Sequence, residues 1–225
     1  MNHDMNCLLS NNLFSYDRTI AAPLLQSTSY GWEALSGISD FIKELGPQLD
    51  ASLYTDMGDD VYIAKSAKVA PSAYISGPCI ICPEAEIRHC AFIRGSVIIG
   101  AGAVVGNSTE LKNCILFDRV QVPHYNYVGD SILGYKSHLG AGAVTSNVKS
   151  DKSEVMIKKD DFSLGTKRKK VGAMLGDGVE IGCGAVLCPG TVIGKNTTVY
   201  PLVRVRGYVP EDHIVKSEQE IVRKR

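Results

Sequence analysis

The chain has 225 residues, which is room for one domain and an appendage but not for two large domains. Its 24 lysines and arginines balance 24 aspartates and glutamates, so no global field is available to hold nucleic acid or an anionic membrane. With 44% hydrophobic residues and a mean hydropathy of +0.00, the chain can bury a core and is not typical of a disordered protein.

Targeting and redox signals indicate a compartment. The longest apolar runs, such as residues 79–82 and 97–99, are far shorter than the roughly 20 residues that span a bilayer. The N-terminus lacks a basic segment followed by a long apolar stretch, so no secretory signal is expected. Seven cysteines are an odd number, scattered through a chain that is long enough to fold without disulfides. We therefore expect a cytoplasmic protein with reduced thiols and no membrane partner.

The first predicted element is an amphipathic helix over residues 30–45, within an N-terminal helical arm over residues 1–58. Its apolar residues fall mainly three and four positions apart: Trp32, Leu35, Ile38, Phe41, Ile42 and Leu45. Gly46-Pro47 follows and predicts the end of the helix. The apolar face needs a partner, either as a cap on the first coil of the following domain or as a contact with another protein.

From residue 63 the sequence repeats every six positions. Nine aliphatic residues follow one another at this spacing without a gap: Ile63, Val69, Ile75, Ile81, Ile87, Ile93, Ile99, Val105 and Leu111. A second, mostly small residue lies four positions after each of the first eight, and we expect it also to point inward: Ala67, Ala73, Cys79, Ala85, Ala91, Val97, Ala103 and Thr109. Turn-compatible residues such as Pro71, Gly77 and Gly102 lie between them. Each hexapeptide is therefore predicted to form one short strand and one corner.

The same period returns near the C-terminus, at Leu175, Ile181, Leu187, Ile193, Val199 and Val205. Three hexapeptides make a triangular coil, and stacked coils bury a continuous aliphatic column, so we predict one all-β solenoid over residues 59–209. The pattern resembles the hexapeptide-repeat left-handed β-helix family. That resemblance implies the left hand, because general chirality rules favour right-handed crossovers.

Two further segments break the repeat. Residues 146–170 lose the sixfold phase and contain eight lysines and arginines, which predicts an excursion from the coil stack. Its basic residues form either a solvated loop or a clamp for coenzyme A phosphates. Nucleic acid is disfavoured, because neither interleaved aromatic residues nor a recognition helix accompanies the charges. The charged residues 210–225 are expected to form a short helical tail.

Departures from a regular repeat mark candidate sites. The stretch FDRVQVPHYNYVGD over residues 117–130 places bulky polar residues where other coils keep small ones, and His124 among them is a candidate general base or else a surface histidine. Residues 18 apart stack on one corner, about 4.8 Å apart, which aligns Arg94 with Lys112. Two aligned cations suit an anionic group such as a phosphate, unless Glu110 or Asp130 compensates them on a solvated corner.

At these residues the chain resembles the acetyltransferase domain of the bifunctional glucosamine-1-phosphate acetyltransferase and N-acetylglucosamine-1-phosphate uridylyltransferase. The shared segments are IRG with Arg94, VGNSTELKN with Lys112, HYNYVGD with His124 and Tyr127, and LGAGAVTSN with Asn147. The later stretch KRKKVGAMLGDGVEIGCGAVLCPGTVIG is similar to related archaeal sugar-phosphate nucleotidylyltransferases that end in an amino-sugar acetyltransferase domain.

The resemblance implies a role for each matching residue. His124 would be the base that deprotonates the sugar amine, which then attacks the thioester of acetyl-CoA through a tetrahedral intermediate. Arg94 and Lys112 would hold the sugar phosphate, Tyr127 would contact the same substrate, and Asn147 would contact the sugar.

Four other positions concern the cofactor and the acceptor pocket. By the same resemblance, Ala141 and Cys183 match positions near the acetyl and pantetheine parts of acetyl-CoA. His138 and Val148 stand where bacterial members usually have Asn and Tyr. The acceptor pocket therefore differs from theirs, with His138 as one of its substrate-binding residues.

Metal-dependent alternatives fit the sequence poorly. A γ-class carbonic anhydrase needs three convergent histidines, and resemblance to it requires a His followed five residues later by another, which is not found among the five histidines. Cys79-x-x-Cys82 is not accompanied by a second CxxC and is better read as two structural cysteines. We expect no metal site.

The sequence therefore predicts a cytoplasmic acetyl-CoA-dependent N-acetyltransferase acting on a phosphorylated or nucleotide-linked amino sugar. A homotrimer is implied by the resemblance, because the family's active sites lie between neighbouring coil stacks. The glycine-rich LxAGxGTRM-like stretch of a nucleotidyltransferase domain is absent from the sequence. A nonenzymatic alternative is a β-helix scaffold or regulatory subunit of a separate nucleotidyltransferase, which would not need the predicted site residues together.

Overall fold

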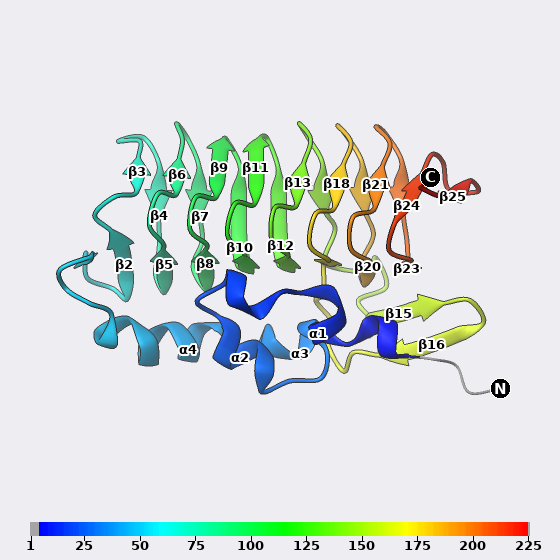
Figure 1. Cartoon of the computed structure of the whole chain (residues 1–225), viewed down its shortest axis with the longest axis horizontal. Helices are drawn as coiled ribbons and strands as arrows, with labels where there is room; N and C mark the ends of the chain where they lie inside the picture. The colour runs from blue at the N-terminus through cyan, green and yellow to red at the C-terminus, as the bar shows by residue number, and fades with distance from the viewer. Residues whose placement is uncertain (1–4, 225) are drawn as a thin grey trace.

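The computed structural model describes residues 5–224; residues 1–4 of the predicted arm and residue 225 of the predicted tail lie outside this range. A helical arm is followed by a solenoid of short strands (Figure 1). The arm consists of η1 (Asn6–Leu8), α1 (Ser10–Leu13), η2 (Tyr16–Arg18), α2 (Ala22–Gln26), α3 (Gly31–Ala34), α4 (Ile38–Leu45) and η3 (Gly46–Gln48).

The solenoid is a left-handed β-helix with three faces, as predicted. The arm face, named for the segment that covers it, contains β1 (Tyr54–Asp56), β2 (Val61–Ala64), β5 (Cys79–Ile81), β8 (Val97–Ile99), β17 (Ala173–Leu175), β20 (Thr191–Ile193) and β23 (Tyr208–Val209). The second face contains β3 (Lys68–Val69), β6 (Glu86–Ile87), β9 (Val104–Asn107), β11 (Gln121–His124), β13 (His138–Leu139), β18 (Glu180–Ile181), β21 (Thr198–Val199), β24 (His213–Val215) and β25 (Ile221–Arg223).

The third face, here called the polar face, contains β4 (Tyr74–Ile75), β7 (Phe92–Ile93), β14 (Val144–Thr145), β19 (Val186–Leu187) and β22 (Arg204–Val205). Two longer strands, β10 (Glu110–Leu116) and β12 (Tyr127–Leu133), run from the polar face around a corner onto the arm face. Neighbouring strands are parallel within each face, apart from the antiparallel pairs β1–β2 and β24–β25. Parallel stacking places equivalent residues of successive coils side by side.

The register explains why the sixfold phase slips after Leu111. Ile93 pairs with Leu111, eighteen residues later, whereas Leu111 pairs with Val128, seventeen residues later. The coil from Leu111 to Val128 is therefore one residue shorter than the coil from Ile93 to Leu111. The shortening lies at the corner between the polar face and the arm face, where the tight turn is made at Asn113 and Asp130, both with positive φ.

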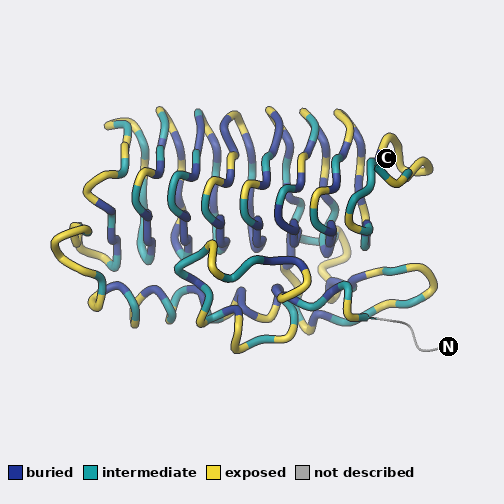
Figure 2. The backbone as a smooth tube through the Cα atoms, viewed as in Figure 1, coloured by how far each residue is buried: buried dark blue, intermediate teal, exposed yellow. Residues whose placement is uncertain are grey.

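The predicted aliphatic column forms the core. Ile81, Ile93 and Leu111 are fully buried, and so are the small residues Ala85 and Ala103 that were expected to point inward. Figure 2 shows the buried positions following the inner side of successive coils.

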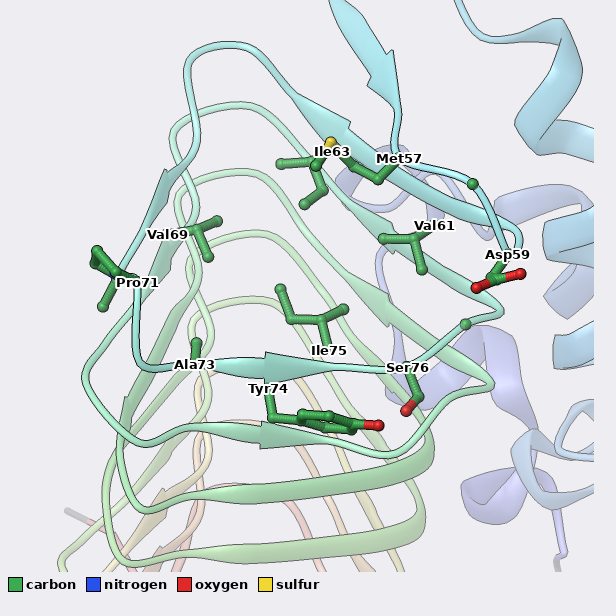
Figure 3. A pocket seen from close by; sticks show the side chains of 13 residues that line it. Met57, Asp59, Val61, Ile63, Val69, Pro71, Ala73, Tyr74, Ile75 and Ser76 are labelled. Atoms are coloured by element: carbon green, nitrogen blue, oxygen red, sulfur yellow. The ribbon is translucent and has the colours of Figure 1, made fainter.

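The first coil is the exception to this burial. Val69 is 36% exposed, and Ile63 and Ile75 are only partly buried. Together with Met57 they face a hollow of about 710 Å³ at the open N-terminal end of the solenoid (Figure 3). The helical arm therefore does not cap the first coil.

The arm packs instead along the length of the arm face (Figure 1). Helix α4 contacts β8 and β10, and α3 contacts β12. The predicted single helix over residues 30–45 is in fact two helices separated by Leu35 to Gly37, and the second ends at Leu45 as expected. Gly37 at this break packs closely against α2, because a Cβ there would lie 2.9 Å from Leu24 Cδ1.

The C-terminal tail was wrongly predicted to be helical. Val215 continues the sixfold spacing from Val209, and β24 extends the second face by pairing with β21. The chain then turns back at residues 217–220, and β25 pairs antiparallel with β24. The free edge of β21 offers backbone partners that an isolated short charged helix lacks.

The excursion takes the form of a β-hairpin, β15 (Met156–Lys159) and β16 (Phe162–Gly165). Its base is anchored rather than fully solvated, because Val155 and Ile157 are buried and β15 contacts β20 and β23. No helix in residues 5–224 is long and apolar enough to cross a membrane.

Candidate functional site

The polar face carries aromatic and charged residues that point away from the core. Phe92, Glu110 and Tyr127 lie side by side on β7, β10 and β12. Arg94 and Lys112 lie two residues further along adjacent coils, so the predicted pair shares one column.

Both cations of this column already have a carboxylate partner. Arg94 Nη1 lies 2.6 Å from Glu110 Oε1, and Lys112 Nζ lies 3.2 Å from Asp130 Oδ2. These are the two carboxylates that the sequence offered as compensation. In the absence of a ligand, the two pairs are electrically neutral, so the column has no surplus positive charge of its own.

Asp130 is the centre of this polar cluster, with a side chain only 3% exposed. Besides Lys112, it accepts hydrogen bonds from Asn113 Nδ2 at 2.8 Å and from Asn147 Nδ2 at 2.5 Å. Asn147 Nδ2 also lies 3.2 Å from the Tyr127 hydroxyl. One buried carboxylate therefore links three predicted substrate-binding residues, namely Lys112, Tyr127 and Asn147.

Tyr127 is kept as a neutral phenol in this cluster. Its partial burial, reinforced by the carboxylates of Asp130 and Glu110, raises the pKa of the Tyr127 hydroxyl above its usual value. Because the hydroxyl oxygen accepts from Asn147, its proton is free to be donated to a ligand.

His124 lies at the end of β11, where the chain turns from the second face onto the polar face. Asn126, which is 2% exposed, fixes this corner. Its Oδ1 accepts the His124 backbone N–H at 3.1 Å, and its Nδ2 donates to the carbonyls of Gly140 and Ala143 at 2.8 and 3.0 Å. The exposed His124 therefore lies where the second face ends at this corner, and Tyr127 lies where the polar face begins.

The two predicted cofactor residues lie in the same column as His124. The Gly142 N–H donates to the His124 carbonyl at 3.0 Å, and the Gly184 N–H donates to the Ala141 carbonyl at 2.8 Å. His124, Ala141 and Cys183 thus occupy successive coils, and all three are exposed. At about 4.8 Å per coil, His124 and Cys183 are roughly 10 Å apart along the column.

His138 is placed away from the polar cluster of this chain. It lies on the second face between Gln121 and Glu180, and its Nδ1 is 2.9 Å from Glu180 Oε2. It is three residues before Ala141 on the same coil, so it lies in a different column from His124.

Sequence reasoning recognised Asp130 only as a counterion and gave Asn126 no separate role. The signal for both was the same: each is a polar residue in the shortened coil that starts after Leu111. A polar side chain inside such a coil must find partners when it is buried, which predicts a structured network there.

In residues 5–224 no group of three or more His, Cys, Asp and Glu side chains is placed to hold an ion. Cys79 and Cys82 are both buried, and burial raises the pKa of the Cys82 thiol to about 12. A thiol with such a pKa remains protonated near neutral pH and is a poor metal ligand.

Comparison with known families places the chain in a class. Residues 172–207 match the family described as bacterial transferase hexapeptide (six repeats), and residues 75–163 match the family described as the GMPPB C-terminal domain. The first of these matches agrees with the left-handed β-helix of hexapeptide repeats that the strand topology defines.

The relatives are more specific. The chain is 31% identical over 200 residues to the bifunctional protein GlmU of Methanococcus vannielii, with 86% of this chain and 47% of that protein covered. It is 30% identical over 141 residues to a bifunctional sugar-1-phosphate nucleotidylyltransferase/acetyltransferase of Sulfurisphaera tokodaii, with 63% and 35% covered. These matches confirm the resemblance, and the chain spans about half the length, or less, of these relatives.

Two further proteins are similar over a larger share of their own length. An uncharacterized acetyltransferase, YaiX, of Escherichia coli O6:K15:H31 is 28% identical over 182 residues, with 80% of this chain and 79% of that protein covered. A mutant of the N-acyltransferase AntD from Bacillus cereus, solved with dTDP and coenzyme A, has a TM-score of 0.41 and 18% identity over 74% of this chain and 81% of its own. That structural likeness is too distant to bear on function.

Proposed function

We propose that the protein is an acetyl-CoA-dependent N-acetyltransferase that acts on a phosphorylated or nucleotide-linked amino sugar. The observation that carries the proposal is the polar cluster around Asp130, which holds Lys112, Tyr127 and Asn147 together beside the corner of His124. A hexapeptide-repeat fold and relatives named as acetyltransferases support the same class.

In the proposed reaction, His124 is the general base. It accepts a proton from the sugar amine as the nitrogen attacks the thioester carbon of acetyl-CoA. The new C–N bond forms, the C–S bond breaks, and coenzyme A leaves as a thiolate that takes up a proton. Ala141 and Cys183 lie in the column of His124, so a pantetheine chain laid along this column would bring its thioester next to the imidazole.

The polar cluster would receive the sugar. Tyr127 donates its hydroxyl proton, and Asn147 and the two cations provide further contacts. Because Arg94 and Lys112 are already paired with Glu110 and Asp130, an acceptor phosphate must share these cations with the carboxylates or displace them. An acceptor whose own amine or hydroxyls hydrogen-bond to those carboxylates would keep every charge compensated.

We further propose that the active form is a homotrimer. Within residues 5–224, the imidazole of His124 has no hydrogen bond or ion pair that orients it, although a general base is usually oriented by a further group. A neighbouring coil stack would supply that group and cover the exposed column. Light scattering should then give three times the chain mass of 24.3 kDa, and a monomer that is fully active would refute the trimer.

Thiol release from acetyl-CoA tests the proposed function. The purified protein should be assayed with amino sugars, their 1-phosphates and their nucleotide-linked forms, and the acetylated product should be identified by mass. Turnover with a phosphorylated amine would establish the reaction and name the acceptor. Absence of turnover with every amine, together with absence of coenzyme A binding, would favour the scaffold alternative.

A further inference from the structure

The return segment of the excursion, residues 167–170, reads KRKK and lies against the polar cluster. Backbone hydrogen bonds fix it there: the Gly172 N–H donates to the Asp130 carbonyl at 2.8 Å, and the Val171 N–H donates to the Asn147 carbonyl at 3.0 Å. On the other side, the Val155 N–H donates to the Arg168 carbonyl at 2.8 Å. The segment is therefore held in place at both ends.

A hollow of about 530 Å³ lies between this segment and the solenoid. Its lining consists of Lys112, Asn113, Asp130, Lys167, Arg168, Lys169 and Lys170. The hollow is thus lined by five cations and a single carboxylate, and that carboxylate belongs to the polar cluster.

The charge of the hollow comes from the return segment rather than from the solenoid. Lys112 is neutralised by Asp130. Within residues 5–224, no ion pair involves the side chains of the four basic residues of the segment. The nearest compensation is Glu154, which accepts the backbone N–H of Lys167 at 2.6 Å. About three positive charges therefore remain in excess around the hollow.

Arg168 provides a second observation. Its Nε is buried and has no hydrogen-bond partner in the described part of the chain. A buried guanidinium nitrogen without a partner is costly, so the surrounding protein leaves this part of the Arg168 guanidinium uncompensated.

We propose that residues 167–170, together with Lys112, bind a diphosphate group. A diphosphate presents oxygens on two phosphorus centres, so it can contact more of these separate cations at once than a single phosphate can. This inference rests on the proposed function for its source, since both acetyl-CoA and a nucleotide-linked amino sugar contain a diphosphate. The positive charge that would bind the anion then comes from the excursion, because Arg94 and Lys112 are each paired with a carboxylate.

Calorimetric titration at low salt tests the proposal with three probes: inorganic pyrophosphate, UDP and coenzyme A. The test variant carries Lys167→Gln, Lys169→Gln and Lys170→Gln, and it keeps Arg168 because part of that side chain is buried. We expect the Kd for pyrophosphate, and for UDP or coenzyme A, to rise at least about tenfold. The affinity of the unmodified protein should also fall with added salt more steeply than that of the variant.

A matched triple variant controls for the loss of three charges. Lys43→Gln, Lys152→Gln and Arg223→Gln remove three exposed cations that do not line the hollow, and this variant should bind all three probes like the unmodified protein. If the test variant binds UDP more weakly but binds coenzyme A normally, the site belongs to the acceptor. If it binds coenzyme A more weakly but binds UDP normally, the site belongs to the cofactor. Equal affinities of the two triple variants for every probe, or no pyrophosphate binding by the unmodified protein, overturn the proposal.

Binding and turnover separate this inference from the proposed function. If no amine is acetylated but the triple variant still loses pyrophosphate affinity, the proposed function fails while the diphosphate site stands. If acetylation is observed and neither triple variant changes any affinity, the proposed function stands while the diphosphate site fails.

Discussion

The arm face and the polar face are built on the same coils. They differ in the residue of each strand whose side chain points outward, away from the core. On the arm face this residue is aliphatic or Met on successive coils, and each is fully buried: Ile80, Ile98, Ile115, Ile132, Met174 and Val192. On the polar face the outward residues include Phe92, Glu110, Tyr127 and Arg204. The arm face binds the chain's own arm, and the polar face remains open to solvent.

This difference shows how one repeat carries both stability and a site. The inward column is shared by all faces and needs only aliphatic residues, so the outward positions are free to vary. Covering an outward aliphatic side chain with the arm contributes about 1.5–3 kcal/mol per residue to folding. A polar face makes no such contribution, but its side chains can bind a ligand.

The largest expected effect is on the arm face. Ile115→Ala removes a side chain that is 0% exposed between the arm and the solenoid, and it should lower the free energy of unfolding by about 2–5 kcal/mol. Denaturant unfolding measures this change. Ile221→Ala, at a position that is 45% exposed, removes the same atoms and should cost less than about 1 kcal/mol. Equal losses in the two variants would mean that the arm does not stabilise the face.

On the polar face, Asp130→Ala should affect stability and activity together. The substitution leaves Lys112, Asn113 and Asn147 without their common acceptor, which should cost about 1–3 kcal/mol of stability. Because three proposed contacts lose their positions, kcat/KM should also fall by about tenfold or more. Asp130→Asn keeps an acceptor, so its stability and its kcat/KM should lie between those of Asp130→Ala and those of the unmodified protein. If both variants matched the unmodified enzyme in thermal unfolding and in kinetics, Asp130 would not organise the cluster.

Arg94→Ala sharpens the comparison within the polar face itself. The guanidinium is exposed, so its loss should leave thermal unfolding nearly unchanged. If Arg94 contacts an acceptor phosphate, KM for a phosphorylated amine should rise about tenfold, and KM for the unphosphorylated amine should hardly change. Steady-state kinetics with the two acceptors measure this difference, and equal losses on both would argue against a phosphate contact.

The smallest effect is expected on the second face. Glu180→Gln weakens the exposed pair with His138, which is worth about 0.2–1 kcal/mol or less. Acetyl transfer should remain within about twofold, because Glu180 is not part of the polar cluster or of the His124 column. A large loss of activity would show that His138 must be held by Glu180 to contact the acceptor.

Much of the scaffold was predictable because a sixfold aliphatic period admits few folds. The column from Ile81 to Leu111 and the stacking of Arg94 on Lys112 follow from spacing alone. Burial of Ile98 and Ile115 on the arm face was not predicted, although three consecutive apolar residues in a short strand indicate burial on both sides.

Other features depended on long-range contacts that a single sequence does not display. The arm was expected to end as a cap or a partner contact, but it covers a face, because that face presents the matching apolar surface. The tail was expected to be helical, but the edge of β21 recruited it as β24. Asp130 reaches Asn147 only because a shortened coil turns its side chain inward toward the next coil.

The most direct test of the central claim is the rate of thiol release from acetyl-CoA by His124→Ala, compared with the unmodified enzyme on the same phosphorylated amino sugar. We expect kcat to fall by about 10²-fold to 10⁴-fold, as for a lost general base, while thermal unfolding is unchanged because the side chain is exposed. An unchanged kcat in the folded variant would remove His124 from the mechanism and contradict the assignment of this edge as the active site.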